Sequence, residues 1–568
     1  MKLGLFKGED KPNKKVIWDF YERGKRYNDK IDLDATVRCN ENFYIGKQWE
    51  GVEANGLPTP VFNFIKRVVM FDVASISASN IKVNATSLAG TNDDLIQAVD
   101  VVNDAFDELT EQNNIQFKQK ELARNAAVDS DGCMYTYWDA DADLGQDAKG
   151  TPRTEMLDNT DVFFGNPMDR EVQKQPYVLI RSLLPTREVM IRAKENGAKD
   201  WEAIKPDGEY IEAIDHEKIC DDMTTLILCL WRNPETKTIW GYECTQDCEV
   251  TEPWDLEIRL YPIVWLNWDY VKNSYHGQGL VTGILNNQIF VNRAYASSFL
   301  SLNRAAFSKY AIDGTRVAGL DNRIGGVVKV NGDPTNAIKI IDPPVISPQV
   351  SEYISRAIED TEKCLGATSV ALGDTRPDNT SAIIALQRAA ATPIELTKQY
   401  LYKAIEDLYR IYLEFMAVYY GKRYVDTKTP QKTGDAYSFV GMETPDKIPA
   451  MYDFSLLKKY NFKIKLDVGD SSFYSESASI NSLDKLFEKG AIDEIQYLER
   501  LPKGHIPDSE GLIADLKAKR AMMMQQQAPM GATVPEQPEG PMEIPNTGGG
   551  YGALQRKINE TGDTASVL

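Results

Sequence analysis

The residues best suited to binding a metal ion are three aspartates in a short acidic tract. Asp139, Asp141 and Asp143 alternate as the first ligands of a calcium loop do. The glycine of such a loop falls one place late, at Gly145, and a glycine also stands where the bidentate glutamate belongs. We therefore interpret residues 139–150 as the polar tip of a hairpin, and we keep calcium binding as the less favoured alternative.

The sulfur and imidazole side chains form no recognisable metal or catalytic motif. Cys244 and Cys248 make a C-x₃-C pair, but no second pair and no nearby histidine completes four zinc ligands. The seven cysteines are scattered and odd in number, which favours a reducing compartment over a disulfide framework. The three histidines are far apart and belong to no metal or nucleophile–base motif: His216, His276 and His505.

The remaining enzyme class that we considered is a glycoside hydrolase, because the chain has nine tryptophans and many carboxylates. The tryptophans fall mainly in strand-like runs, where they are ordinary core residues. No G-x-x-x-x-G-K-[ST] motif occurs, which excludes a P-loop ATPase. We predict a protein that is not an enzyme, with no catalytic residue, no cofactor and no bound metal. Glycan hydrolysis remains the least favoured alternative.

Charge and length restrict the function further. The chain has 568 residues, with 84 acidic and 64 basic side chains and a net charge of −20. Tight, sequence-independent binding of phosphates needs a basic surface, so this composition argues against it. It suits a surface past which DNA moves without sticking. The charged N-terminus is no signal peptide and no apolar run approaches the ~20 residues of a membrane span, so we expect a soluble protein made in a cytoplasm.

The first half of the chain is predicted to mix helices with antiparallel strands. Hydrophobic periodicity indicates helices within 16–48, 59–80, 93–127 and 186–196. The first of these is expected to end at Gly46. Strands are indicated by runs that alternate with a period of two or are continuously apolar. These runs are 81–83, 134–138, 177–184, 224–232, 238–243 and 261–268.

The second half is predicted to contain three helices around a small strand insert. A helix rich in Asn, Ser, Ala and Arg covers 280–309, and a second helix covers 347–365. Between them the runs IGGVVKV and AIKII are expected to be short strands. A long helix over 381–420, ~60 Å at 1.5 Å per residue, should be kinked at Pro393, which removes a backbone hydrogen bond. Strands at 422–425 and 461–468, a helical stretch over 476–525 and a Gln-, Pro- and Gly-rich tail complete the chain.

This order of elements resembles the portal family of tailed double-stranded DNA bacteriophages. The local sequences that carry the resemblance are FYIGKQW and NFIKRVV near the start, EDTEKCLGATSVALGDTRPDNTSAIIALQRAAA at 359–391, and LFEKGAIDEIQYLERL at 486–501. Each motif is weak alone, and the order of the parts from residue 16 to residue 525 carries the weight.

The resemblance implies an α+β portal fold that includes a long kinked helix and assembles as a cyclic ring. Its parts are wing, stem, clip and crown. Mapped on this chain, they are a mobile N-terminal arm (1–15), the first part of the wing (16–276), stem helix 1 (277–309), the clip (310–346), stem helix 2 (347–366), the tunnel loop (367–380), the long kinked helix with the second part of the wing (381–475), the helical crown (476–525) and a disordered tail (526–568).

The resemblance also implies the function of a portal protein in the virion. A homo-oligomeric ring, usually of twelve subunits, would occupy one capsid vertex and conduct the genome during packaging and ejection. Its partners would be further copies of itself, the terminase large subunit, the head–tail adaptor, major capsid and scaffolding proteins, and double-stranded DNA bound without sequence specificity. The resemblance also implies that the protein is made in the host bacterial cytoplasm and that no membrane is involved. Another virion structural protein, an adaptor or minor capsid protein, is the main alternative, although adaptors are usually much shorter.

Two groups of residues are expected to meet the DNA. The polar loop after the second stem helix would form the narrowest point of the channel: Gly373, Asp374, Thr375, Arg376, Pro377, Asp378, Asn379 and Thr380. Polar, mostly small or uncharged residues of the first stem helix would line a wet bore and allow close packing around a ring: Asn286, Asn287, Arg293, Ser297, Ser301, Asn303 and Arg304.

Overall fold

The computed structural model describes most of the chain up to residue 501. The described residues are 12–54, 56–77, 81–87, 93–143, 145, 148–211, 218–306, 309–317, 319, 327–341, 348–366, 394–428, 447–468, 480, 483–490, 492–501, 511–513, 516 and 519. The chain divides into two compact units, Met1–Glu476 and Ser477–Leu568, which are treated separately below.

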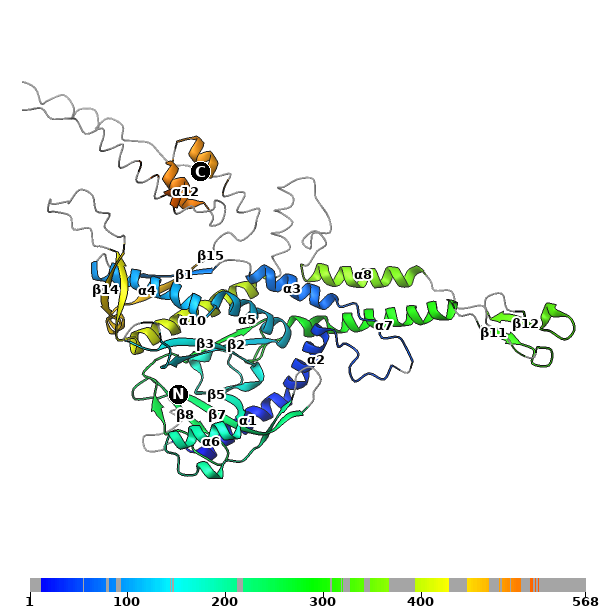
Figure 1. The fold of residues 1–568 in the computed structure, drawn as a ribbon, viewed down its shortest axis with the longest axis horizontal. Helices are drawn as coiled ribbons and strands as arrows, with labels where there is room; N and C mark the ends of the chain where they lie inside the picture. Colours follow the sequence, from blue (N-terminus) through cyan, green and yellow to red (C-terminus); the bar gives the residue numbers. More distant parts are fainter. Residues whose placement is uncertain are drawn as a thin grey trace, which may run out of the picture. The chain divides into compact units, whose positions relative to one another are not determined.

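The first unit opens with two helices, α1 (Lys14–Lys30) and α2 (Leu33–Ile45) (Figure 1). The prediction of one continuous helix was wrong, because the chain turns at Asp32, whose φ is 50°. A left-handed aspartate interrupts the helical hydrogen bonds without a glycine or proline to signal the break. The expected end at Gly46 is confirmed, since this residue caps α2 with a φ of 100°.

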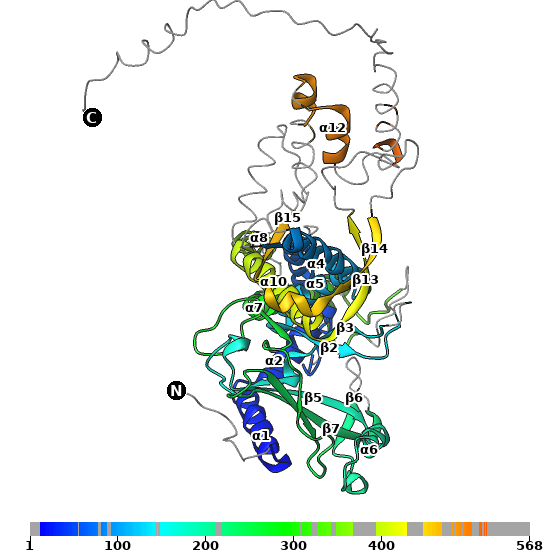
Figure 2. The same ribbon diagram turned by 90° about the vertical axis from the view of Figure 1, so that its left-hand side faces the viewer.

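A six-stranded antiparallel sheet forms one layer of the first unit. Its strand order is β4-β5-β7-β8-β9, and β6 also pairs with β7. α1 packs against it through Ile17 and Tyr21, and α6 packs elsewhere on the same sheet (Figure 2). The elements are β4 (Val162–Phe164), β5 (Tyr177–Pro185), α6 (Thr186–Glu195), β6 (Gly208–Ile211), β7 (Lys218–Arg232), β8 (Ile239–Cys244) and β9 (Trp254–Asp255).

A three-stranded antiparallel sheet, in the order β10-β2-β3, supports the main hydrophobic core. Its strands are β2 (Asp131–Asp139), β3 (Thr151–Leu157) and β10 (Ile263–Asn267), and β2 and β3 form the predicted hairpin. Helices α3 (Phe64–Ser77), α4 (Asp93–Gln112), α5 (Ile115–Asp129) and α10 (Glu395–Tyr419) contribute to the same core. The apolar side of α10 packs into this core, because Leu401, Leu408 and Phe415 are buried.

Two pairs of strands complete the first unit. β1 (Ile81–Ser87) pairs with β15 (Phe462–Val468), and β13 (Lys422–Lys428) pairs with β14 (Lys447–Asp453). β14 was not predicted, since its sequence KIPAMYD contains a proline and alternates weakly. Short 3₁₀ turns occur at η1 (Asn159–Asp161), η2 (Val172–Lys174), η3 (Trp201–Ala203), η4 (Pro334–Asn336) and η6 (Phe454–Lys459).

Two helices, α7 (Leu280–Ala306) and α8 (Pro348–Cys364), lead away from the sheets to and from a small strand pair (Figure 1). This pair is β11 (Lys309–Ile312) with β12 (Ile338–Ile341). The helix was predicted to reach Lys309, but Lys309 already belongs to β11, where pairing with Ile341 decides its conformation. AIKII is confirmed as a strand, whereas the described part of IGGVVKV makes only an isolated bridge between Val330 and Val317.

The second unit is helical in its described part, as predicted. Residues 483–488 form a helix, and α12 (Glu494–Arg500) follows a capping box at Asp493. The two helical segments contact each other, since the Phe487 and Tyr497 rings lie 5.1 Å apart. The tail from residue 526 lies outside the described residues.

Candidate functional site: the helix pair α7 and α8

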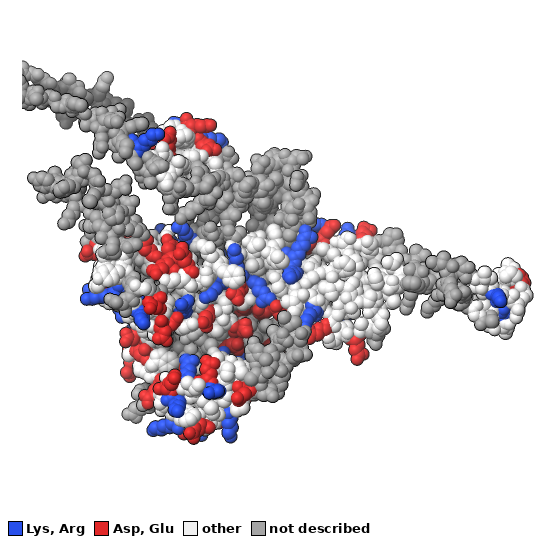
Figure 3. Space-filling view, in the orientation of Figure 1, with Lys and Arg blue, Asp and Glu red and all other residues white. Residues whose placement is uncertain are grey.

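Helices α7 and α8 carry different charges. The 27 residues of α7 include two arginines and no acidic residue. α8 has four acidic and two basic residues in 17 positions. The surface over the two helices is largely uncharged in Figure 3, in contrast with the rest of that face of the first unit. A duplex carries a dense negative charge, so the absence of carboxylates on α7 makes it the helix of the pair better suited to lie near DNA.

The carboxylate of Asp131, at the start of β2, fixes the turn that precedes α7. We call this connection between β2 and α7 the joint. One oxygen accepts hydrogen bonds from the Gly277 backbone and from the Asn267 side chain, each at 2.7 Å. The other oxygen lies 2.6 Å from His276 Nδ1. Asp131 and His276 are almost fully buried, with exposed fractions of 1% and 3%. Such a buried, multiply bonded carboxylate holds the turn before α7 in one conformation.

Close backbone packing tightens the same joint. The Gly279 backbone donates a 3.0 Å hydrogen bond to the Ser130 hydroxyl. A Cβ on Gly279 would lie 3.0 Å from the Val128 carbonyl oxygen, which is tighter than ordinary contact. Ser130 itself has a φ of 84°, an uncommon value for a residue with a side chain. The joint between the sheet and α7 is therefore rigid and intolerant of larger residues.

Aromatic rings enclose His276. Its ring centroid lies 3.9 Å from that of Tyr275, 5.7 Å from Trp265 and 6.3 Å from Tyr27. Nε2 is buried and has no hydrogen-bond partner in the part of the chain that the structure describes. The sequence predicted no role for His276, and the histidine proves to be part of the joint that fixes α7.

A second anchor fixes the middle of α7 through buried amides. The Gln288 side chain donates to the Phe62 carbonyl oxygen at 2.8 Å and to the Asn292 side chain at 2.9 Å. Asn292 in turn donates to the Gln48 side chain at 2.6 Å. One side of α7 is thereby fixed to the segment between α2 and α3, and α7 also packs against α2, α3, α5 and α8.

The structure places the predicted stem residues on α7 as follows. Ser301 is half-buried, and Arg304 lies in the helix, with its side chain outside the described part. Asn287 donates a 2.9 Å hydrogen bond to the Thr361 hydroxyl of α8, so its amide faces the partner helix. Five of the seven are exposed: Asn286, Asn287, Arg293, Ser297 and Asn303.

Part of the predicted set shares one face of α7. Asn286, Arg293 and Ser297 are separated by seven and four residues, which are close to whole helical turns. Phe290 lies on the same face and is 51% exposed. The tunnel-loop residues 373–380 and the kink at Pro393 lie outside the described residues; regular helix α10 begins at Glu395.

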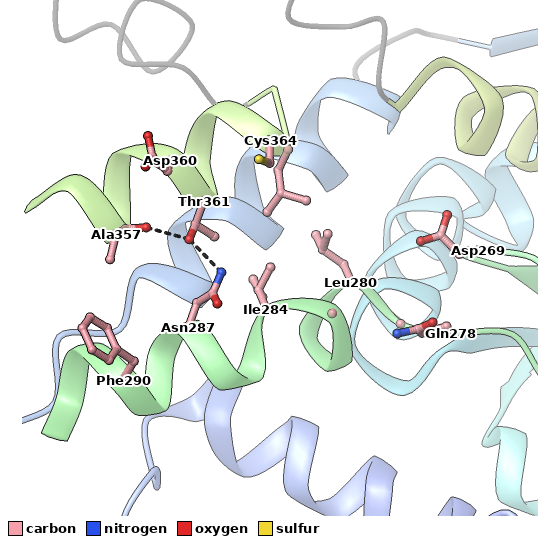
Figure 4. Close-up of a pocket in the computed structure, with 13 residues that line it drawn as sticks. Asp269, Gln278, Leu280, Ile284, Asn287, Phe290, Ala357, Asp360, Thr361 and Cys364 are labelled. Carbon is pink, nitrogen blue, oxygen red and sulfur yellow. Dashed lines mark hydrogen bonds between the residues drawn. The ribbon is translucent and has the colours of Figure 1, made fainter. Parts of the chain in front are cut away.

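A groove of about 520 Å³ runs between α7 and α8 near their base (Figure 4). Its lining is mixed: Ile284 and Ala357 are apolar, Asn287 and Thr361 are joined by a hydrogen bond, and Asp360 stands at the edge. Asp269 also lines the groove, and burial raises the pKa of its carboxyl above the ordinary value. The other members are Gln278, Gly279, Leu280, Gly283, Phe290, Cys364 and Leu365.

The metal candidates from the sequence occupy ordinary structural positions. Asp139 forms an ion pair with Arg153 at 3.2 Å and accepts a hydrogen bond from the Asp141 backbone. Cys244 and Cys248 are both buried, and burial raises the pKa of each thiol. Within the described ranges no group of three or more His, Cys, Asp or Glu side chains is arranged to hold a metal ion.

Comparison with known protein families identifies the family of this chain. The family model described as Phage P22-like portal protein matches residues 32–545. The chain belongs to the P22-like phage portal protein family. The resemblance seen in the sequence is thereby confirmed over nearly the whole chain. The portal family consists of structural proteins of the bacteriophage capsid that serve DNA packaging and head–tail connection.

A search of individually curated proteins gave no significant match. Among the described residues, no helix of this portal protein is both long enough and apolar enough to cross a membrane. Sequence reasoning found α7 and most of its exposed polar face, but it missed the joint at Asp131 and the groove beside α8. Both depend on residues far apart in the chain, and no local spacing indicates them.

Proposed function

We propose that this portal protein forms a ring, dodecameric in the simplest case, at one capsid vertex and conducts double-stranded DNA during packaging and ejection. The observation that carries the proposal is α7, a helix without acidic residues whose free face presents Asn286, Arg293 and Ser297. Small polar groups and an isolated arginine meet a passing duplex without gripping it, because tight binding needs many phosphate contacts. We assign this face to the wall of the channel.

The strand pair at the far end of α7 is proposed as the docking site for the terminase motor and later for the head–tail adaptor. The described part of this strand pair and of the segment between its strands exposes apolar side chains: Val327 is 81% exposed, Ile341 52% and Ile312 39%. Exposed apolar groups of this kind are typical of surfaces that a partner protein covers. The proposed clip comprises residues 310–346, between stem helices at 277–309 and 347–366.

The other parts follow the same proposed division: wing segments at 16–276 and 381–475, a crown at 476–525, a tail at 526–568 and an N-terminal arm at 1–15. The tunnel loop, 367–380, is proposed as the narrowest point of the channel on the strength of the family resemblance. The proposed partners are neighbouring subunits, major capsid and scaffolding proteins, terminase and adaptor.

A bulky residue on the free face of α7 tests the channel role. We expect Ser297→Trp to leave the ring intact and to reduce DNA-filled heads at least tenfold, because one ring carries many copies of the obstruction. Ser351→Trp, an exposed serine on α8, is the matched control and should package normally. Normal packaging by Ser297→Trp, or an equal loss in both variants, would remove α7 from the channel wall.

Deletion of residues 373–380 tests the loop separately. We expect rings of normal mass with impaired packaging or loss of packaged DNA, measured as DNA content per head. Heads filled and retained at the normal level would contradict the proposed role of the loop in the channel.

A further inference from the structure

The groove between α7 and α8 is open and negatively charged. Its lining contains the carboxylates of Asp269 and Asp360 and no lysine or arginine. Phe290 at one edge is 51% exposed, and Cys364 at the other edge is also exposed. Asp360 takes part in no ion pair among the described residues. The groove therefore suits an apolar side chain that is accompanied by a cation.

The outer face of α3 has the complementary character. Met70 is 57% exposed, and Lys66, one turn earlier, lies on the same side of the helix. The Lys66 ammonium lies 5.7 Å from the centre of the Tyr44 ring and makes no ion pair within the described ranges. The acidic residue of α3, Asp72, is buried on the opposite side. The exposed face of α3 thus combines an apolar side chain, Met70, with a cationic one, Lys66.

The two surfaces are separate, because neither Lys66 nor Met70 lines the groove. In Figure 4 the groove faces the viewer, and α3 runs behind α7 and α8. Arg67 of α3 lies 3.8 Å from Glu362 of α8, and neither residue lines the groove. Within one subunit these two complementary surfaces do not meet, since no ion pair joins Lys66 to Asp360 among the described residues. They suit a head-to-tail contact, the kind of interface that closes into a ring.

We propose that, in the ring, the groove of each subunit receives Met70 of the neighbouring subunit, and that Lys66 of that neighbour pairs with Asp360. This inference rests on the ring proposed above and names the contact that joins its subunits. The small residues Gly283 and Ala357 leave room for the methionine, and burial of its side chain excludes water from the ion pair.

Cross-linking with the native thiol tests this contact in the full chain. In Met70→Cys, mild oxidation should join the new thiol to Cys364 of the next subunit, giving a ladder of covalent oligomers on a denaturing gel. Met70→Cys combined with Cys364→Ser should give no ladder. Met168→Cys is the matched control, because Met168 is 68% exposed on another part of the first unit and should also give no ladder.

The outcomes separate this inference from the ring itself. Intact rings with a ladder that needs both thiols support the contact. Intact rings without a ladder, or with an equal ladder from Met168→Cys, overturn the contact and leave the ring standing. Protein that forms no rings in any variant, wild type included, contradicts both proposals.

Charge reversal provides an independent test by rescue. Asp360→Lys and Lys66→Glu should each lower the fraction of protein in rings at least tenfold, and the double variant should recover most of it. Glu352→Lys makes the same change eight residues earlier on an exposed position of α8 and should assemble normally. Failure of the double variant to recover, while each single variant remains folded by circular dichroism, would overturn the pairing.

Discussion

At the residue scale, Asp131 links the sheet to α7. Its carboxylate meets three partners in a site with almost no solvent access, namely His276, the Gly277 backbone and Asn267. Removal of such a group leaves its partners buried without hydrogen bonds. The position of the proposed channel helix thus depends on one side chain outside that helix.

We expect Asp131→Ala to lower the free energy of unfolding by about 3 kcal/mol or more, because the partners of the carboxylate stay buried. The measurement is chemical denaturation of the subunit. Glu171→Ala is the matched control: it removes an exposed carboxylate paired with Lys174, and its effect should stay within about 0.5 kcal/mol. Equal effects in the two variants would contradict the structural role of Asp131.

Burial of the Asp72 carboxyl predicts that the stability of the folded protein depends on pH. Burial raises the pKa of its carboxyl from 3.8 to about 7, and among the described residues neither oxygen has a hydrogen-bond partner. The unfolded chain releases this proton near pH 4, whereas the folded chain keeps it up to about pH 7. Between these values the folded state binds more protons, so its stability falls as pH rises.

Asp72→Asn should remove this contribution. We expect the variant to gain stability relative to the wild type between pH 4 and pH 8, by up to about 4 kcal/mol for three pKa units. Denaturation of both proteins across this range measures the difference, in which other titrating groups cancel. A constant difference at all pH values would show that Asp72 titrates normally.

The residues of the joint could not be predicted because their relation is not local. Asp131 and His276 are 145 positions apart, and the sequence reading treated His276 as an isolated histidine. The shared face of the predicted stem residues was accessible from the sequence, because helical periodicity alone places Asn286, Arg293 and Ser297 on one face; their role in the channel stays a prediction. That spacing does not show what surrounds the face, so the hydrogen bond of Asn287 to α8 was not foreseen.

At the element scale, α10 is the clearest case of a helix fixed by its apolar pattern. Leu401 is fully buried, whereas Leu396, in the first turns of the same helix, is 58% exposed. We expect Leu401→Ala to lower the free energy of unfolding by about 2–5 kcal/mol, since it leaves a cavity in the main core. Leu396→Ala should change it by less than about 1 kcal/mol in the same denaturation experiment. A similar loss in both would contradict the packing of α10.

Element type was predictable where periodicity is strong, and boundaries were not. α4 and α5 were predicted as one helix, but the chain turns at Asn114, whose φ is 51°. The break between α1 and α2 has the same cause at Asp32. Asp and Asn enter this conformation more readily than most residues yet are common in helices, so the sequence gives little warning. β11 was missed because its strand character comes from pairing with β12.

At the scale of the whole molecule, composition distinguishes residues 526–568 from the rest of the chain. Residues 526–568 are rich in Pro, Gly and Gln and low in apolar residues, so they have little to contribute to a core. We expect a chain truncated after residue 525 to form rings of correspondingly lower mass, measured by light scattering. Failure of the truncated chain to assemble, with the full chain assembling in parallel, would contradict this expectation.

The central claim is that this portal protein closes into a ring with a central channel. The most direct measurement is the mass of the purified full-length protein by light scattering, combined with negative-stain images of the same sample. Twelve copies of the 63.8 kDa chain correspond to about 766 kDa, and we expect closed rings near that mass with a central hole. A protein that remains a monomer or dimer at high concentration, also when its capsid and scaffolding partners are added, would contradict the account.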